Sequence, residues 1–204
     1  MEGTETGMRI CFIGDSLVNG TGDEMFLGWP GRISLQAREK GCEITLYNLG
    51  VRRDTAVDIA QRWEREAKAR LTPENDGRVV FSFGTNDCLS HTRGEGFVSE
   101  AESITHAAGI LEKACRWLPT LMIGPPPALD GKLNARIARF SALLQDICDD
   151  HLIPFLSVCD ALATCNVWRG ALEAGDGFHP NAAGYAVLTS LIDSWVPWRE
   201  WMDR

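Results

Sequence analysis

The chain has 204 residues, of which 45% are hydrophobic and 24% are charged, and this composition suits one soluble globular domain with its own core. The formal net charge of -8 argues against a nucleic-acid partner or an anionic membrane surface, because both bind basic proteins. No apolar run approaches the ~20 residues of a transmembrane helix, so we expect no membrane insertion.

The seven cysteines are odd in number and form no CxxC pair, which favours neither a disulfide framework nor a zinc site. The N-terminal residues do not show the basic and apolar pattern of a secretory signal. We therefore expect a cytoplasmic protein with free thiols. Residues 1–7 are rich in Gly, Thr and Glu, and we expect them to be a frayed tail.

Short apolar runs alternate with amphipathic segments along the chain, which indicates strands alternating with helices. The predicted strands are 8–13, 43–49, 78–83, 120–123 and 153–158. The predicted helices are 30–40, one that opens at 54–55 and ends before Pro73, 97–117, 131–149, and a last one from about 180 to 195. This order predicts an α/β fold with a five-stranded parallel sheet and helices on both faces. The longer loops are expected at 14–29, 84–97 and 159–178.

Polar residues and glycines follow the predicted strands where parallel sheets bind their ligands, at the carboxyl ends. Ser16 follows the first strand, Gly50 the second and Asn86 the third, while Asp176 and His179 precede the last helix. We expect all five to meet at one edge of the sheet.

These residue types are the ones that acyl transfer needs. A serine hydroxyl attacks a carbonyl only when a base takes its proton, and a carboxylate commonly orients that base. Ser16 supplies the hydroxyl, His179 the base, and Asp176 a carboxylate three residues before the histidine. The N–H groups of Ser16 and Gly50 and the side-chain amide of Asn86 are candidate donors to the oxyanion.

The four segments together resemble the signature of the GDSL or SGNH hydrolases. They read GDSLVNG (Gly14 to Gly20), NLGVRRDT (Asn48 to Thr55), GTNDC (Gly84 to Cys88) and DGFHPNAAGY (Asp176 to Tyr185). The resemblance implies a three-layer α/β/α, flavodoxin-like fold and hydrolysis of a small-molecule ester or thioester without a metal or cofactor. The positions that match its name are Ser16, Gly50, Asn86 and His179, with Asp176 as the histidine's partner.

Each residue also has a simpler interpretation. Ser16 alone could cap a helix, His179 could lie on a surface loop, and Asn86 could be a turn residue. We expect Asp15 and Asp87 to be mainly structural, bonded to loop N–H groups. The competing functions are a flavodoxin-like nucleotide-binding protein, a metal-dependent phosphohydrolase that uses Asp15, and a binding module that has lost catalysis.

The sequence leaves the acyl group and the alcohol open. Candidate substrate-binding residues are Trp29, Arg52, Trp168 and Phe178, with Phe97 as a further wall of the pocket. Arg52 and Arg53 could grip a carboxylate or phosphate, or they could be a solvated pair or bridge to Asp54 or Asp58.

The C-terminal tryptophans 195, 198 and 201 form an apolar stripe. We expect this stripe to pack over the sheet; the alternative is a dimer contact, so a homo-oligomer is possible.

Overall fold

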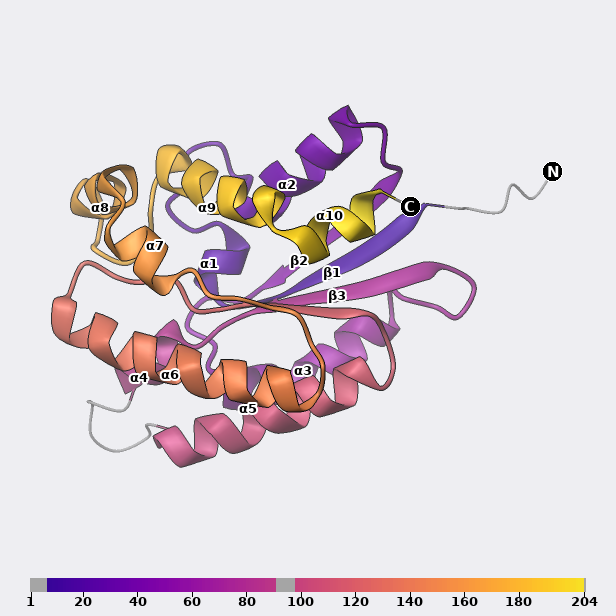
Figure 1. Ribbon diagram of the computed structural model, residues 1–204, viewed down its shortest axis with the longest axis horizontal. Coiled ribbons are helices and arrows are strands. Elements are labelled where there is room, and N and C mark those ends of the chain that lie inside the picture. Colours follow the sequence, from indigo (N-terminus) through magenta and orange to yellow (C-terminus); the bar gives the residue numbers. More distant parts are fainter. Residues whose placement is uncertain (1–6, 91–97, 204) are drawn as a thin grey trace.

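A computed structural model describes residues 7–90 and 98–203, and a five-stranded parallel sheet of order β2-β1-β3-β4-β5 forms the middle of the molecule (Figure 1). The strands are β1 (Met8–Gly14), β2 (Ile44–Gly50), β3 (Asp76–Ser82), β4 (Thr120–Ile123) and β5 (Phe155–Leu156). The expected α/β fold with five parallel strands is therefore confirmed. The predicted tail at residues 1–7 lies outside the described residues except for Gly7.

Helices cover both faces of this sheet and give three layers (Figure 1). One face carries α1 (Ser16–Asn19), α2 (Gly28–Glu39), α7 (Cys159–Ala163), α8 (Asn166–Glu173), α9 (Ala182–Ser194) and α10 (Val196–Met202). The other face carries α3 (Ala56–Lys68), α4 (Thr85–Ser90), α5 (Glu100–Cys115) and α6 (Gly131–Asp150). Among the described residues, no helix combines the length and apolar character needed to cross a membrane.

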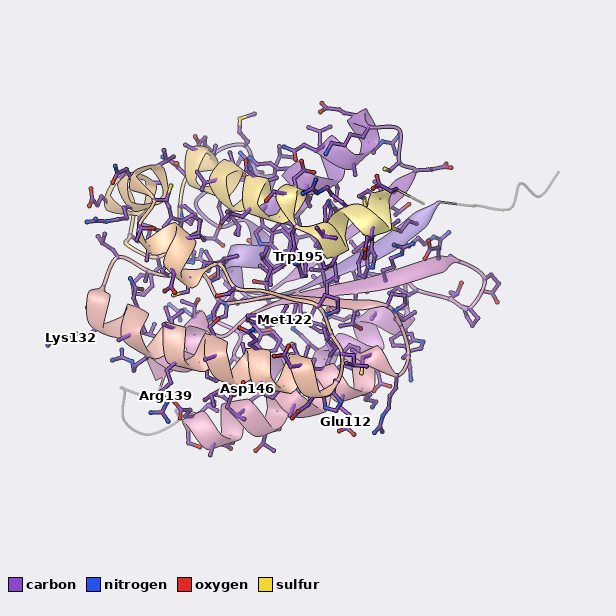
Figure 2. All side chains as sticks on the ribbon, viewed as in Figure 1. Glu112, Met122, Lys132, Arg139, Asp146 and Trp195 are labelled. Carbon is purple, nitrogen blue, oxygen red and sulfur yellow. The ribbon has the colours of Figure 1, made fainter. Side chains whose placement is uncertain are left out.

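Alternation along the strands divides the apolar residues between two cores, one on each face. On β1, Ile10 and Phe12 belong to the core under α2 and α9, whereas Cys11 and Ile13 belong to the core over α3 and α5. In Figure 2, the labelled Met122 lies in the middle layer, whereas charged side chains such as Lys132 and Arg139 lie on the outside of α6. Because the central strands are buried on both faces, they read as continuous apolar runs in the sequence.

Side-chain caps begin several of these helices. The Asp58 carboxylate accepts hydrogen bonds from the backbone N–H and hydroxyl of Thr55 at the start of α3. Asp130 caps α6, and Asn181 caps α9 by accepting from the N–H groups of Ala183 and Gly184. The last long helix therefore begins two residues later than Pro180, where we expected it.

Two parts of the sequence-based prediction are wrong. The fifth strand is two residues long, since it pairs only with β4 through Phe155 and Leu156, and Pro154 before it has no N–H to donate. The expected loops at 14–29, 84–97 and 159–178 contain the short helices α1, α4, α7 and α8. Such helices are stabilised by packing more than by propensity, so their sequences carry a weak signal.

The C-terminal tryptophans cover the sheet, as expected. The Trp198 ring lies 6.3 Å from the Phe12 ring on β1, and Trp198 is only 1% exposed. The guanidinium of Arg78 lies 5.1 Å from the Trp201 ring centre, a cation–π contact. Trp195, labelled in Figure 2, lies at the junction of α9 and α10. The stripe is thus part of the core.

Candidate active site

The carboxyl ends of β2, β1 and β3, which are neighbours in the sheet, lie side by side. Gly14, the last residue of β1, is in register with Gly50 at the end of β2 and with Ser82 at the end of β3. Ser16 lies two residues after the end of β1 and Asn86 four residues after the end of β3. The parallel register therefore brings them to one edge, as predicted.

Two glycines allow the chain to close tightly at this edge. A Cβ on Gly14 would lie 1.9 Å from the carbonyl oxygen of Ser82, and one on Gly50 would lie 2.1 Å from the backbone nitrogen of Asn19. Real side chains do not fit such distances. The turn that carries Ser16 is therefore held by backbone packing against its neighbours.

Asp15 is the N-cap of α1, the short helix that begins at Ser16. Its Oδ1 accepts a hydrogen bond of 2.9 Å from the Leu17 N–H, and Gly20, with φ 85°, ends α1. Burial is the main reason why the pKa of Asp15 rises to about 7, and the nearby Asp87 carboxylate adds to the rise. Asp87 Oδ1 in turn accepts from the Ala56 N–H at 3.0 Å. Both carboxyls thus accept backbone N–H groups, as expected, although these N–H groups lie in the first turns of α1 and α3 and not in loops.

The hydroxyl of Ser16 lies within hydrogen-bond distance of an imidazole. His179 Nε2 is 2.8 Å from Ser16 Oγ, and His179 Nδ1 is 2.6 Å from Asp176 Oδ2. Asp176 Oδ1 accepts the N–H groups of Phe178 and His179, each at 2.9 Å. This chain of contacts can move a proton from the hydroxyl to the imidazole while the carboxylate holds the ring.

Asp176 is an ionised carboxylate in this arrangement. Partial burial raises its pKa, but hydrogen bonds from the His179 ring and from two backbone N–H groups outweigh that effect and lower the pKa to about 2. Gly177, with φ 81°, makes the turn that lets Asp176 reach back to the histidine.

The candidate oxyanion donors differ in how far they are already bonded. Ser16 begins α1, where the first N–H groups have no partner within the helix. The Asn86 amide lies at the cleft and donates to the Asp54 carbonyl at 3.0 Å and to Asp15 Oδ2 at 3.4 Å. The Gly50 N–H donates to Asn48 Oδ1 at 3.0 Å, so it is occupied in this structure.

A loop after α1 supports the histidine from behind. A Cβ on Gly22 would lie 3.0 Å from His179 Cβ, which shows how closely this loop packs. The Tyr185 hydroxyl donates to the Thr21 carbonyl at 2.8 Å, and Glu24 accepts the Ala182 N–H at 3.0 Å. Sequence reasoning did not assign these supporting residues, although Tyr185 lies inside the quoted DGFHPNAAGY segment.

Arg62 on α3 ties together the backbone beneath the site, and it was also missed. Its guanidinium donates to the carbonyl oxygens of Gly14 and Leu49, at 2.9 and 3.0 Å, and pairs with Asp54 at 2.6 Å. It thereby joins the ends of β1 and β2 to the turn before α3. A single arginine on a helix face gives no sequence signal for such a role.

A cleft of about 590 Å³ opens beside Ser16 and His179. Its walls include Arg52, Arg53 and Phe178 among the predicted residues, and Leu17, Thr55, Asp58, Thr85, Leu89 and Val98 in addition.

Trp29 and Trp168, predicted to bind substrate, are both 0% exposed and do not line the cleft. Trp29 packs edge-on against Phe12, and Trp168 Nε1 donates to the Pro127 carbonyl at 3.0 Å. Both are core residues because α2 and α8 turn their apolar faces to the sheet. Phe97 lies outside the described residues.

Arg52 and Arg53 are exposed at the mouth of the cleft, in the turn between β2 and α3. The predicted alternative of a bridge to Asp54 or Asp58 is wrong, because Asp54 pairs with Arg62 and Asp58 bonds Thr55. Within the described ranges, no three His, Cys, Asp or Glu side chains lie close enough to hold a metal ion.

Solved structures of the same fold come from several bacterial and environmental sources. A lipase/acylhydrolase from Enterococcus faecalis is 24% identical over 97% of this chain and 96% of its own, with a TM-score of 0.72. An acetylxylan esterase from Geobacillus stearothermophilus is 20% identical over 91% and 92%, with a TM-score of 0.72. An alpha/beta hydrolase from the metagenome of Lake Arreo, Spain, is 20% identical over 93% and 95%, also with a TM-score of 0.72.

No curated protein sequence matches the chain. The model of the GDSL-like Lipase/Acylhydrolase family matches residues 12–187, which include all four motif segments. The resemblance drawn from those segments is thereby confirmed. The chain belongs to the GDSL-like lipase/acylhydrolase family and is an ester hydrolase of that family.

Proposed function

We propose that the protein hydrolyses small carboxylic esters through an acyl-serine intermediate, with Ser16 as nucleophile, His179 as base and Asp176 as its partner. The observation that carries this proposal is the continuous contact from Ser16 Oγ to His179 Nε2 and from His179 Nδ1 to Asp176 Oδ2, at 2.8 and 2.6 Å. Few arrangements other than nucleophilic catalysis require these three groups in this order.

In the first half of the reaction, His179 takes the Ser16 proton while Oγ bonds to the ester carbonyl carbon. The carbonyl oxygen becomes negative and is stabilised by the Ser16 N–H and the Asn86 amide. The intermediate collapses, the ester C–O bond breaks, and His179 gives the proton to the departing alcohol. In the second half, water attacks the acyl-serine in the same manner and releases the acid.

Asn86 requires a small rearrangement to act as an oxyanion donor. One of its N–H groups is held by the Asp54 carbonyl at 3.0 Å, and the other makes a longer contact of 3.4 Å to Asp15. The longer contact is the weaker one, so we expect it to be exchanged for the oxyanion. Gly50 would likewise have to release Asn48 before its N–H could contribute.

The substrate class is proposed from the cleft and the relatives together. The apolar side chains of Leu17, Leu89, Val98 and Phe178 suit a short acyl chain. One solved structure of the same fold is an acetylxylan esterase and another a lipase/acylhydrolase. Acetyl and other short-chain esters are therefore the first substrates to test, beside acetylated sugars and acyl-CoA thioesters.

The alternative of a flavodoxin-like nucleotide-binding protein gains no support at this site. A phosphate-binding loop after β1 would offer its N–H groups to an anion. Here the buried Asp15 carboxyl accepts the Leu17 N–H, so this group is not offered to an anion.

The experiment that tests the proposal is a chain-length series of p-nitrophenyl esters, combined with intact-protein mass spectrometry. We expect a mass increase of one acyl group on the wild-type protein and none on Ser16→Ala, which should also lose at least about 10⁴-fold in kcat. Ser190→Ala is a matched control, because this exposed α9 serine bonds only its own helix. Wild-type turnover by Ser16→Ala would refute the mechanism.

We also propose a cytoplasmic location, supported by the seven free cysteines. Burial raises the pKa of Cys11, Cys88 and Cys148 to about 12, so these thiols are unreactive. Fractionation of cells that express a tagged chain tests the location.

A further inference from the structure

The turn between β2 and α3 presents two arginines, Arg52 and Arg53, to the catalytic cleft. Within the described residues, neither side chain has a hydrogen-bond or ion-pair partner. Arg62, nine residues further on, shows the opposite behaviour, since its guanidinium bonds two carbonyls and two carboxylates. The two cations at the cleft are thus available to a ligand, whereas the one beneath it is committed to the fold.

The carboxylates that line the same cleft are already bonded within the protein. Asp15 accepts the Leu17 N–H, Asp58 accepts two hydrogen bonds from Thr55, and Asp176 accepts three from the segment 178–179. These bonds come from neutral donors and leave ionised carboxylates charged, so the cleft contains both signs of charge. Among the described residues, what distinguishes the two arginines is that no carboxylate of the cleft occupies their N–H donors, although the whole chain carries a formal charge of -8.

Arg53 occupies a backbone conformation that ordinarily favours glycine. The Asp54 N–H donates to the Val51 carbonyl at 3.3 Å, which closes a four-residue turn with Arg53 at its third position and φ 73°. Such a turn prefers Gly or Asn at this place. A non-glycine residue held there costs stability, and such strain concentrates at functional sites.

The turn is also fixed relative to the reacting groups. The Val51 N–H donates to the Gly14 carbonyl at 3.0 Å, two residues before Ser16. The Asp54 carbonyl accepts the Asn86 amide at 3.0 Å, and the Asp54 carboxylate pairs with Arg62. A group bound by the two arginines would consequently be held at a fixed distance from Ser16 and Asn86.

We infer that Arg52 and Arg53 form an anion subsite, by which the protein selects esters that carry a carboxylate or phosphate on the acyl or the alcohol side. This inference rests on the proposed ester hydrolysis at Ser16. Guanidinium groups bind both anions through paired N–H donors. Since the net charge of the chain repels anions at long range, the selection acts locally, after the ester has entered the cleft.

The test uses pairs of esters that differ only in the anionic group. The acyl-side pair is mono(4-nitrophenyl) adipate and 4-nitrophenyl hexanoate. The alcohol-side pair is 3-acetoxybenzoate and phenyl acetate, and 3-acetoxyphenyl phosphate provides the phosphate arm. We expect wild-type kcat/KM to be higher for the anionic member of at least one pair, and this preference to shrink as NaCl rises from 0.05 to 0.5 M.

Three variants locate the effect. Arg52→Gln and Arg53→Gly should each lower the ratio of anionic to neutral kcat/KM by about 2- to 5-fold, mainly through KM, as expected for one charge-assisted contact at an exposed site. Arg53→Gly should keep or raise the melting temperature, because glycine relieves the turn, so a lost preference would not reflect misfolding. Arg116→Gln is the matched control, because it removes one exposed charge, which is paired with Glu112. It should change kcat/KM for neither the anionic nor the neutral ester.

The outcomes separate the two proposals. Equal kcat/KM for both members of every pair in the wild type, or an unchanged ratio in Arg52→Gln and Arg53→Gly, would overturn the anion subsite while leaving Ser16 acylation intact. Failure of the proposed function would instead appear as no acyl adduct on Ser16 with any of the esters. A preference confined to one arm identifies carboxylate or phosphate and the side of the ester that carries it.

Discussion

The two halves of the candidate site are built in different ways. On the nucleophile side, Asp15 and Ser16 are only 2% and 6% exposed and lie in a turn enclosed by neighbouring backbone. On the base side, the Asp176 side chain is 55% exposed and that of His179 is 16% exposed. Steric closure therefore positions the serine, whereas hydrogen bonds within a short surface segment position the histidine.

The two halves should therefore respond differently to substitutions. The nucleophile side should tolerate no added volume, because its glycines are surrounded by backbone atoms that cannot move aside. On the base side, the exposed turn at Gly177 should tolerate added volume, whereas the segment depends on its donors and acceptors, whose loss water can partly replace.

After Ser16→Ala, the largest loss of turnover on the nucleophile side is expected from Asn86→Ala. Removing a single oxyanion donor typically costs ~2.7–4 kcal/mol of transition-state stabilisation, or about 100- to 1000-fold in kcat. Turnover of p-nitrophenyl acetate measures the loss, with KM expected to change much less. If kcat stayed within twofold of wild type, Asn86 would not be an oxyanion donor.

Gly14→Ala compared with Gly177→Ala tests the steric difference directly. The Gly14 substitution places Cβ 1.9 Å from the Ser82 carbonyl oxygen, and we expect it to lower the free energy of unfolding by about 3 kcal/mol or more. At Gly177 the nearest atom is 3.6 Å away, so only the positive φ penalises alanine, by about 1 kcal/mol. Urea unfolding gives both values, and equal losses would contradict the comparison.

Asp176→Ala tests the hydrogen-bonded half. A triad carboxylate that is fully buried contributes about 10⁴-fold, but water can reach this one, so we expect a loss of about 100-fold in kcat. Asp176→Asn should be slower still, because its amide can donate to Nδ1 and stabilise the wrong ring tautomer. The reverse order of the two variants would indicate that Asp176 acts mainly by shaping the segment.

The last comparison concerns pH and stability. The pKa of Asp15 is raised to about 7 in the fold from an ordinary 3.8, so the folded state binds more protons than the unfolded state between these values. Its contribution to stability is complete below about pH 3.8, falls as pH rises through 7, and is constant above. Asp15→Asn should remove this slope, and urea midpoints of both proteins from pH 4 to 8 measure it. Parallel curves would mean that Asp15 titrates normally.

Sequence reasoning recovered the parts whose signal is local. Each of these signals lies within a few residues: the apolar run before Gly14, the Asp176–His179 pair, and the positions of Ser16, Gly50 and Asn86 near strand ends. The tryptophans show where it failed. Trp29 and Trp168 lie in segments read as loops, and only the packing of α2 and α8 against the sheet decides that they are buried.

Contacts between segments that are distant in the sequence could not be predicted from the sequence. The hydrogen bond between Tyr185 and Thr21 joins residues 164 positions apart, and the one between Arg62 and Gly14 joins residues 48 apart. Helix α8 is a partial exception, since Trp168, Ala171 and Leu172 follow helical spacing and could have indicated a buried face.

Arg62 holds the turn before α3 from its inner side, and this makes substrate choice separable from chemistry. Because the backbone of that turn is anchored through Asp54, Leu49 and Gly14, the outward residues 52 and 53 can be exchanged without moving Ser16 or Asn86. During evolution, substitutions at these two positions alone could therefore change the substrate preference with little loss of turnover. In protein engineering, the same two codons are the natural place for a saturation library, with Arg62 left untouched.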